Sequence, residues 1–335
     1  MSSSIEAQSR HRRQIPHVAI WLALLTSTAF AQDSKRGFAY TGDTHATDNR
    51  LLSSNSPLEW YYNWSPYPNT NLIPSDSLEF VPMIHGIDAT QSPRTEQVIK
   101  ELPKSSTHLL SFNEPDGTTG SGGSSIKPAD AAKAYIDYVV PFRSGQSGGR
   151  SWKISHPSTT GSPNGLEWLR SFNESCYEID PQSGCPTDFV SAHWYGAFDG
   201  MADWLGTLDE FYNANATRNE PVKIWVTEMG LPQQSAEATV QMMNQTLPYL
   251  DKLEYVEKYA WFGAFRTDDA NEWTGDGVAL FDGDGGLTDL GALYMGQGYV
   301  VGQKGEGQED GAAGVKVRMW MMAALAVCAS VFTSL

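Results

Sequence analysis

The sequence predicts an α/β fold, in which eight parallel strands alternate with helices in one closed (β/α)8 barrel, the TIM barrel. Between Gly37 and about Val300 the chain has eight short apolar runs, each with Gly, Pro, Asn or Ser near its end. Several of the connections between them have helical composition. Eight such units in roughly 250 residues match the size of this barrel. No internal repeat or long linker divides the segment, so a single domain is expected.

The expected strands and helices follow one another in order along this segment. The apolar runs that predict strands are Gly37–Tyr40, Leu58–Asn63, Glu79–Met83, His108–Asn113, Trp152–His156, Phe189–Tyr195, Pro221–Thr227 and Tyr259–Phe265. The stretches that predict helices are Ser92–Leu102, Pro128–Val140, Asn164–Phe172 and Ala236–Leu250. An open doubly wound sheet is the alternative fold. It calls for a glycine-rich nucleotide loop after the first strand, and Gly37–Gly42 matches that pattern poorly.

The first part of the chain predicts a secretory signal peptide. Basic residues from Arg10 to Arg13 precede the apolar run Val18–Leu25, which is too short to span a membrane comfortably. A small-x-small cleavage motif, Ala29–Ala31, follows. We therefore expect residues 1–31 to be removed and the catalytic domain to occupy residues 32–302.

The other end predicts a lipid anchor. Residues 303–335 run from a polar, glycine-containing spacer into an apolar tail that begins at Met319. This pattern is typical of a glycosylphosphatidylinositol (GPI) attachment signal whose tail is removed. A retained membrane-spanning tail is the alternative. The chain is thus expected to be secreted and held at the outer face of the plasma membrane or in the cell wall.

Cysteines and glycosylation motifs agree with an extracellular location. Cys176 and Cys185 bracket a short loop and are expected to form a disulfide in an oxidising compartment. Asn173, Asn215 and Asn244 each begin an Asn-x-Ser/Thr acceptor without proline.

Charge restricts the class of partner. The chain has 39 acidic and 23 basic residues, with a formal net charge of −16. So acidic a protein repels nucleic acids and anionic polymers, which excludes them as expected partners. A neutral partner is expected instead.

Two glutamates follow apolar runs at corresponding places. Glu114 lies in Ser111–Gly117, directly after the fourth expected strand, and Glu228 ends the seventh in Lys223–Gly230. Function in a TIM barrel lies at the carboxyl ends of the strands, so these side chains are expected to converge there. Two converging carboxylates are what cleavage of a glycosidic bond requires. The alternative is that each glutamate only caps a helix or turn.

The other residues at these strand ends suit a sugar site. Aromatic faces pack on the apolar faces of pyranose rings, while amides and other polar groups bind hydroxyls. The residues of these types are Tyr62, Asn63, Trp64, Asn113, His193, Trp194, Tyr195 and Trp261. Phe262 and Phe265 are expected to close the top of the barrel instead.

Two other hydrolase classes have weaker support. His85, His156 and His193 fall near strand ends, where metal-dependent hydrolases gather ligands, but no His-x-His or His-Glu-x-x-His spacing occurs. Ser158 lacks the Gly-x-Ser-x-Gly motif of a serine nucleophile. We therefore expect neither a metal nor another cofactor.

Five motifs together resemble glycoside hydrolase family 128. They are Trp60–Trp64, Phe80–Met83, Leu110–Asp116, Ala192–Tyr195 and Trp225–Gly230. Fungal members of that family are secreted β-1,3-glucanases, so the resemblance implies a TIM barrel that acts on neutral β-glucan. The protein is also expected to be a monomer and to need no cofactor. It also implies that Glu114 is the general acid/base and Glu228 the nucleophile of a retaining reaction.

Further roles are expected for the surrounding residues. Asn113 is expected to bind the 2-hydroxyl of the sugar, and Tyr195 to donate to Glu228. Stacking is expected from Trp194 and Trp261, and the neighbouring subsites are expected to be lined by Tyr62, Asn63 and Trp64. A non-catalytic glucan-binding wall protein and a glucan transglycosylase are the alternative functions. Loop 117–127 follows the acid strand and is expected to be mobile, either covering the cleft or only connecting.

Overall fold

The computed structural model describes residues 34–42, 44–54, 56–214 and 220–305. The expected signal peptide, the acceptor Asn215 and nearly all of the expected anchor signal lie outside the described residues. No helix in the described part of the chain is both long enough and apolar enough to cross a membrane.

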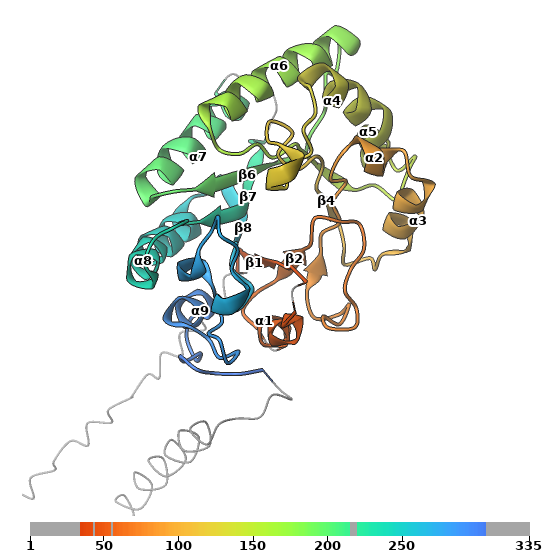
Figure 1. Cartoon of the computed structure of the whole chain (residues 1–335). Helices are drawn as coiled ribbons and strands as arrows, with labels where there is room; N and C mark the ends of the chain where they lie inside the picture. Colours follow the sequence, from red (N-terminus) through yellow and green to blue (C-terminus); the bar gives the residue numbers. More distant parts are fainter. Residues whose placement is uncertain (1–33, 43, 55, 215–219, 306–335) are drawn as a thin grey trace, which may run out of the picture. The chain divides into compact units, whose positions relative to one another are not determined.

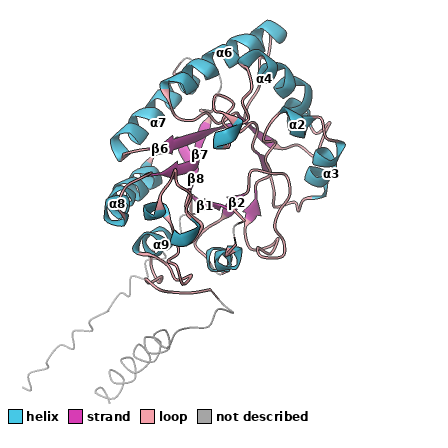
Figure 2. Ribbon diagram, in the orientation of Figure 1, coloured by secondary structure: helices cyan, strands magenta, loops and turns pink. Residues whose placement is uncertain are grey.

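Eight parallel strands form the centre of the fold, with helices around them (Figures 1 and 2). The strand order is β3-β2-β1-β8-β7-β6-β5-β4. Their bounds are β1 (Arg36–Ala39), β2 (Trp60–Tyr62), β3 (Glu79–Phe80), β4 (His108–Leu109), β5 (Lys153–His156), β6 (Phe189–Tyr195), β7 (Lys223–Gly230) and β8 (Val256–Trp261). Each lies within or overlaps one of the expected runs, so the eight predicted strands are confirmed.

The sheet closes between its two outer strands. Just past β3 and β4, Met83 and Leu110 form an isolated parallel bridge. The Leu110 N–H donates to the Pro82 carbonyl at 2.9 Å, and the Ile84 N–H donates to the Leu110 carbonyl at 2.9 Å. The predicted (β/α)8 barrel is therefore confirmed, although β3 and β4 themselves are only two residues long.

The four predicted helices are present, and others join them. The helices are α1 (Arg50–Ser53), α2 (Ile87–Thr90), α3 (Pro93–Glu101), α4 (Pro128–Ala134), α5 (Val140–Ser144), α6 (Pro163–Ile179), α7 (Phe198–Asn213), α8 (Ala236–Lys252) and α9 (Asp289–Met295). A π-helical turn, Tyr135–Val139, separates α4 from α5. Serine side chains cap two of the long helices, Ser162 for α6 and Ser235 for α8.

Helix α7 was not predicted from the sequence. Two glycines, Gly200 and Gly206, lower its intrinsic helix propensity. Its buried residues are nevertheless spaced at helical intervals, at Met201, Leu205 and Leu208. Packing of this face stabilises the helix against its weak propensity.

Side chains alternate between the two sides of the sheet. On β2, Trp60 and Tyr62 belong to the small inner cluster, whereas Tyr61 belongs to the larger core around it. Inside the barrel the Trp225 ring lies 5.1 Å from Trp60 and 4.5 Å from Phe189, measured between centroids. These aromatic rings fill the interior of the barrel, so that a substrate has access only at its ends.

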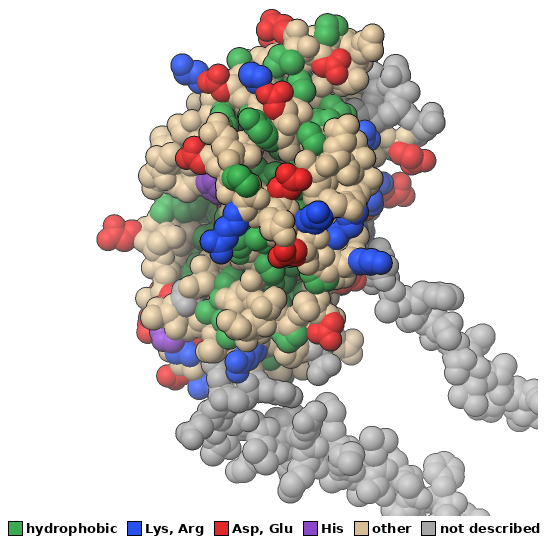
Figure 3. Space-filling view, turned by 90° about the vertical axis from the view of Figure 1, so that its right-hand side faces the viewer, with side chains coloured by type: hydrophobic (Ala, Val, Ile, Leu, Met, Phe, Trp, Pro, Cys, Tyr) green, Lys and Arg blue, Asp and Glu red, His purple; other side chains and the backbone are tan. Residues whose placement is uncertain are grey.

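Outside the barrel, Cys176 in α6 and Cys185 ahead of β6 are joined by a disulfide. On the face in Figure 3, acidic side chains are scattered among basic and uncharged ones instead of forming one patch. That surface offers no concentrated field for a polyanion or a polycation.

Candidate active site

Glu114 lies beyond β4, directly after the isolated parallel bridge between Asn113 and Ser158, in an unusual backbone conformation. The chain there remains hydrogen-bonded to its neighbours: Asn113 N–H donates to the His85 carbonyl at 3.0 Å, and Glu114 N–H donates to the Ser158 carbonyl at 2.7 Å. Glu114 has φ of +38°, a region that residues other than glycine seldom occupy. Such strain is typically found where function requires a particular side-chain direction.

Glu228 lies in β7 next to a β-bulge. The register between β6 and β7 shifts after the pair Ala192–Val226, so that His193 pairs with Glu228 and Thr227 is left over. A bulge changes the direction of the side chains that follow it. The bulge therefore places the Glu228 carboxylate beside His193.

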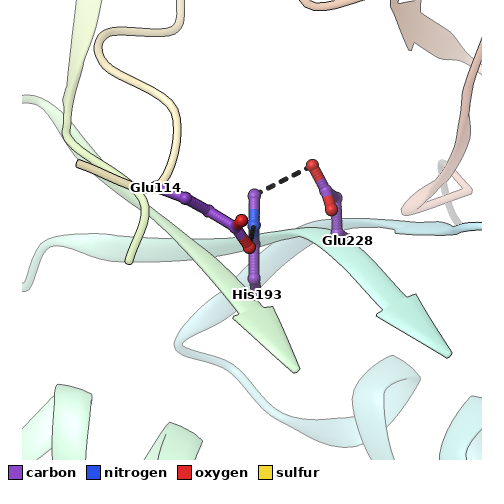
Figure 4. A group of neighbouring side chains, drawn as sticks. All are labelled: Glu114, His193 and Glu228. Atoms are coloured by element: carbon purple, nitrogen blue, oxygen red, sulfur yellow. Dashed lines mark hydrogen bonds and ion pairs between the residues drawn. The ribbon is translucent and has the colours of Figure 1, made fainter. Parts of the chain in front are cut away.

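His193 lies between the two carboxylates (Figure 4). Its ring is fully buried, with Nδ1 2.9 Å from Oε1 of Glu114 and Nε2 3.4 Å from Oε1 of Glu228. Burial by itself lowers the pKa of His193, but the charge of Glu228 and the hydrogen bond with Glu114 outweigh it, so this pKa is raised. A protonated imidazole can donate to both glutamates at once.

The two carboxylates are close enough to act on one bond. One oxygen of Glu114, one of Glu228 and a nitrogen of His193 all lie within 4.8 Å of one another. Retaining glycosidases hold their carboxyl groups about 5–5.5 Å apart, and inverting enzymes about 6.5–9.5 Å. The close approach of one oxygen from each carboxylate therefore favours the retaining arrangement.

The same three residues could also hold a metal ion, since a histidine and two carboxylates suit a divalent cation. Both imidazole nitrogens, however, face the carboxylates, so a metal would have to replace at least one of these contacts. The other two histidines of the metal hypothesis are bound elsewhere. His156 Nε2 lies 2.7 Å from the Cys185 carbonyl, and His85 Nε2 lies 3.1 Å from the Gly122 carbonyl.

Three aromatic residues surround the Glu228 carboxylate with donors. The Trp64 indole donates to Oε1 at 2.7 Å, and the Tyr195 hydroxyl donates to Oε2 at 2.6 Å. The Tyr62 hydroxyl lies 3.3 Å from Oε1 and 3.0 Å from the Thr227 carbonyl. Burial, and next the charge of Glu228, raise the pKa of both tyrosines, which therefore remain O–H donors at neutral pH.

Tyr62 and Trp64 thus contact the Glu228 carboxylate directly, although the sequence suggested only neighbouring subsites for them. Trp64 takes a left-handed conformation with φ of +55°. Its ring packs edge-on against Tyr62 and Phe262, with centroids 5.0 and 5.8 Å away. Phe262 also packs 5.9 Å from Tyr195, so this phenylalanine supports two of the three donors to Glu228, Trp64 and Tyr195.

The prediction that Trp261 stacks on the sugar is wrong. The side chain is fully buried in the outer core, and its indole N–H donates to the Val278 carbonyl at 2.9 Å. Neighbouring residues of a strand face opposite sides of the sheet. On β8 it is Ala260 that faces the inside, and Phe262, not Trp261, packs against Trp64.

The remaining predicted binding residues donate hydrogen bonds to nearby backbone carbonyls. Half-buried Trp194 donates its indole N–H to the Ala197 carbonyl at 3.0 Å, so its ring packs on the start of α7. Asn63 Nδ2 donates to the Tyr67 carbonyl at 2.7 Å. Asn113 Nδ2 donates to the Gly122 carbonyl at 3.2 Å. Binding of the sugar 2-hydroxyl by Asn113 stays a prediction.

The loop after Glu114 is fastened to the end of β4. The Ser124 N–H donates to the Asn113 carbonyl at 2.8 Å, and Ile126 N–H donates to the Pro115 carbonyl at 2.9 Å. A Cβ at Gly123 would stand 2.6 Å from the Glu114 carbonyl oxygen, so this close approach requires glycine. The loop therefore supports the backbone of Glu114. These contacts do not favour the expected mobility of residues 117–127.

Asp116 connects two of the loops at this end. Its Oδ2 accepts from the Thr160 hydroxyl at 2.6 Å, and Oδ1 accepts from the Thr160 N–H at 3.1 Å. Burial raises the pKa of Asp116, against the opposing effect of these hydrogen bonds. Asp116 thus holds the segment after β5 against the segment that carries Glu114.

A cavity of about 650 Å³ lies away from the carboxylates. Its walls include Asp188 and Val222, which immediately precede β6 and β7. That is the amino end of the strands, where TIM barrels do not carry their catalytic residues. The carboxylate geometry therefore identifies the active site better than cavity size does.

Comparison with known proteins agrees with this geometry. The family model described as glycosyl hydrolase catalytic core matches residues 37–294. The chain belongs to this family. It is a glycoside hydrolase, as predicted. No curated protein sequence matches the chain.

Three solved structures of glycoside hydrolase family 128 illustrate the likeness. A subgroup III curdlan-specific exo-β-1,3-glucanase from Blastomyces gilchristii, in complex with glucose, is 28% identical over 78% of this chain and 97% of its own, with a TM-score of 0.57. A subgroup V exo-β-1,3-glucanase from Cryptococcus neoformans is 26% identical over 80% and 100%, with a TM-score of 0.57.

A subgroup II endo-β-1,3-glucanase from Pseudomonas viridiflava is 24% identical over 79% of this chain and 98% of its own, with a TM-score of 0.62. At that identity the likeness shows the fold alone. Together with the family model, these structures confirm the predicted membership of family 128.

Proposed function

We propose that this glycoside hydrolase cleaves β-1,3-glucan with retention of configuration, using Glu114 as acid/base and Glu228 as nucleophile. The observation that carries the proposal is the approach of the two carboxylates to within 4.8 Å at the carboxyl ends of β4 and β7. The β-1,3-glucanase activity of the related structures supports the choice of substrate.

The first step forms a bond between sugar and enzyme. An oxygen of Glu228 attacks the anomeric carbon while Glu114 gives its proton to the glycosidic oxygen, which leaves with the bond's electron pair. The donors from Trp64, Tyr195 and Tyr62 hold the Glu228 carboxylate in a single orientation for this attack. Those contacts distinguish Glu228 from Glu114 and support its role as nucleophile.

The second step restores the enzyme. Glu114, now ionised, takes a proton from a water molecule whose oxygen attacks the anomeric carbon, and Glu228 leaves as a carboxylate. A second glucan hydroxyl in place of water would give transglycosylation with the same residues. His193, which lies 2.9 Å from Glu114 and 3.4 Å from Glu228, would support both carboxylates in the two steps.

Azide rescue tests the assignment of the two roles. A Glu228→Ala variant with an activated aryl β-glucoside and sodium azide is expected to give the α-glucosyl azide, because azide replaces the missing nucleophile. Glu114→Ala is expected to give the β-glucosyl azide, because azide attacks the intermediate formed on Glu228. A Glu254→Ala variant, which lacks an exposed carboxylate, is the control and should give no azide product.

Defined β-1,3-gluco-oligosaccharides test the substrate. Wild-type protein should shorten them, and the size of the products distinguishes internal from terminal cleavage. Retention of the oligosaccharides without any products would instead favour the glucan-binding protein. Products longer than the starting material would identify transglycosylation.

We also propose that the protein is secreted, glycosylated at Asn173, Asn215 and Asn244, and anchored outside the cell by a lipid. The signal-like residues 1–31 and the anchor-like residues 303–335 support the proposal. Phosphatidylinositol-specific phospholipase C should release the protein from intact cells. A chain ending at Gly302 should be found in the medium without that treatment, and release of neither form would contradict the lipid anchor.

A further inference from the structure

Trp273 is an exposed aromatic residue to which the reaction described above gives no role. Its side chain is 57% exposed, more than any other aromatic residue in the described part of the chain. It follows β8, between the short helical turns Thr267–Asp269 and Asp276–Val278. It therefore belongs to the loops at the carboxyl ends of the strands, where Glu114 and Glu228 also lie.

One ring separates Trp273 from the nucleophile. Its ring centroid lies 4.6 Å from that of Tyr195, edge-on at 74°. The hydroxyl of the same tyrosine donates to Oε2 of Glu228 at 2.6 Å. A sugar bound on the outer side of the indole would therefore stand next to the sugar that Glu228 attacks.

The backbone that presents Trp273 is held from both sides. Oδ1 of Asn271 accepts from the N–H groups of Trp273 at 3.0 Å and Thr274 at 2.8 Å. The Gln233 side chain, from the loop after β7, donates to the Trp273 carbonyl at 3.0 Å, and its N–H donates to the Thr274 carbonyl at 2.9 Å. An exposed indole on so constrained a backbone is pre-organised for a ligand.

The surroundings select the chemistry of that ligand. Glu272 precedes Trp273, and Asp276 follows three residues later, so an anionic group is disfavoured. The indole face instead suits the apolar face of a neutral pyranose ring. We infer that Trp273 is a stacking platform for the glucosyl unit that adjoins the attacked sugar on the side away from the cleaved bond, an inference that rests on the proposed function.

Substrate length provides the test. The variants are Trp273→Ala and Trp273→Phe, and Tyr177→Ala serves as control because Tyr177 is also half-exposed but lies on α6. For each protein, kcat/KM is measured on β-1,3-gluco-oligosaccharides of two to six units. In Trp273→Ala the ratio of kcat/KM for the longest to that for the shortest should fall about tenfold. Trp273→Phe should recover most of this ratio, and Tyr177→Ala should keep it.

Other outcomes separate this inference from the proposed function. An equal loss at every length would show that Trp273 acts only through Tyr195, and an unchanged ratio would show that no sugar binds the indole. Either result overturns the inference while leaving the glucanase intact. If the wild-type protein cleaves none of the oligosaccharides, the substrate proposal itself fails. In that case the Glu228→Gln protein is titrated with the hexamer and its tryptophan fluorescence is measured. An unchanged fluorescence would overturn the inference about Trp273 as well.

Discussion

Two histidine–glutamate pairs, each with a buried imidazole, lie in the described part of the barrel, one at each end. At the amino end, His108 Nδ1 lies 2.9 Å from Oε1 of Glu79. At the carboxyl end, His193 Nδ1 lies 2.9 Å from Oε1 of Glu114. The pairs are alike in chemistry and distance, so the pair itself does not identify a catalytic site.

Their surroundings differ in the balance of charge. Lys258 Nζ lies 3.9 Å from Oε2 of Glu79, and Thr107 N–H donates to Oε1. Burial raises the pKa of Glu79, but the hydrogen bond with His108 and these partners outweigh it, so this pKa is lowered. His193 instead faces a second carboxylate, that of Glu228. At the candidate active site, carboxylates therefore outnumber the cations close to them, an arrangement typical of functional sites.

The largest expected effect is a difference in activity between variants at the two ends of the barrel. Glu228→Gln should lower kcat/KM on β-1,3-gluco-oligosaccharides by on the order of 10⁴-fold or more, because the amide cannot form the glycosyl intermediate. Glu79→Gln removes a carboxylate from the other pair and should change kcat/KM less than about threefold. Steady-state kinetics measures kcat/KM for both variants. A comparable loss in the two would contradict the assignment of the reaction to the end that holds Glu228.

His193→Gln should reduce kcat/KM about 10²-fold, because a single amide cannot donate to Glu114 and Glu228 in the same way as imidazolium. The raised pKa of His193 also predicts how the stability of the folded site changes with pH. Its protonated form stabilises the folded site below about pH 6.5, and this stabilisation is lost as pH rises through the raised folded-state pKa.

A pH profile of kcat/KM checks this role. The wild-type profile should therefore show a fall on its alkaline side that His193→Gln lacks. Identical profiles with a uniformly lower rate would assign His193 a structural role only. The melting temperature of the variant shows whether it is folded.

Glu79→Gln should lower the free energy of unfolding by about 1–3 kcal/mol at pH 7, since it weakens a buried hydrogen bond with His108. Because the folded-state pKa of Glu79 lies below its ordinary value of 4.5, its stabilisation is present above that pH and is lost as pH falls through the lowered pKa. Urea unfolding at pH 7 and pH 3.5 should show the difference from wild type shrinking at the lower pH. A difference that grows there would contradict the sign.

The smallest effect is expected for Tyr195→Phe. The variant keeps the ring that packs on Trp273 and Phe262 but removes the donor to Oε2 of Glu228. A loss in kcat of about tenfold is expected, because Trp64 and Tyr62 still hold the other oxygen. Pre-steady-state kinetics with an activated aryl glucoside should place the loss in formation of the intermediate. A defect confined to KM would instead assign Tyr195 to substrate binding.

The sequence alone determined the barrel and the two carboxylates. The information for both is local: an apolar run ending in turn residues defines a strand, and a glutamate at that end is positioned by its own strand. Glu114 and Glu228 were therefore identifiable before any contact between them was known.

Only the tertiary structure decided which side chains meet them. The choice between Trp261, the last residue of β8, and Phe262, which follows it, depends on the side of the sheet that each one faces. The place of His193 depends on the bulge in β7. Trp273 meets Tyr195 across 78 positions of the chain, counted as 273 minus 195. One-residue differences in register reverse the direction of a side chain, and contacts between strands depend on residues far apart in sequence. The register of a strand and its contacts with distant strands cannot be read from the composition of a single segment.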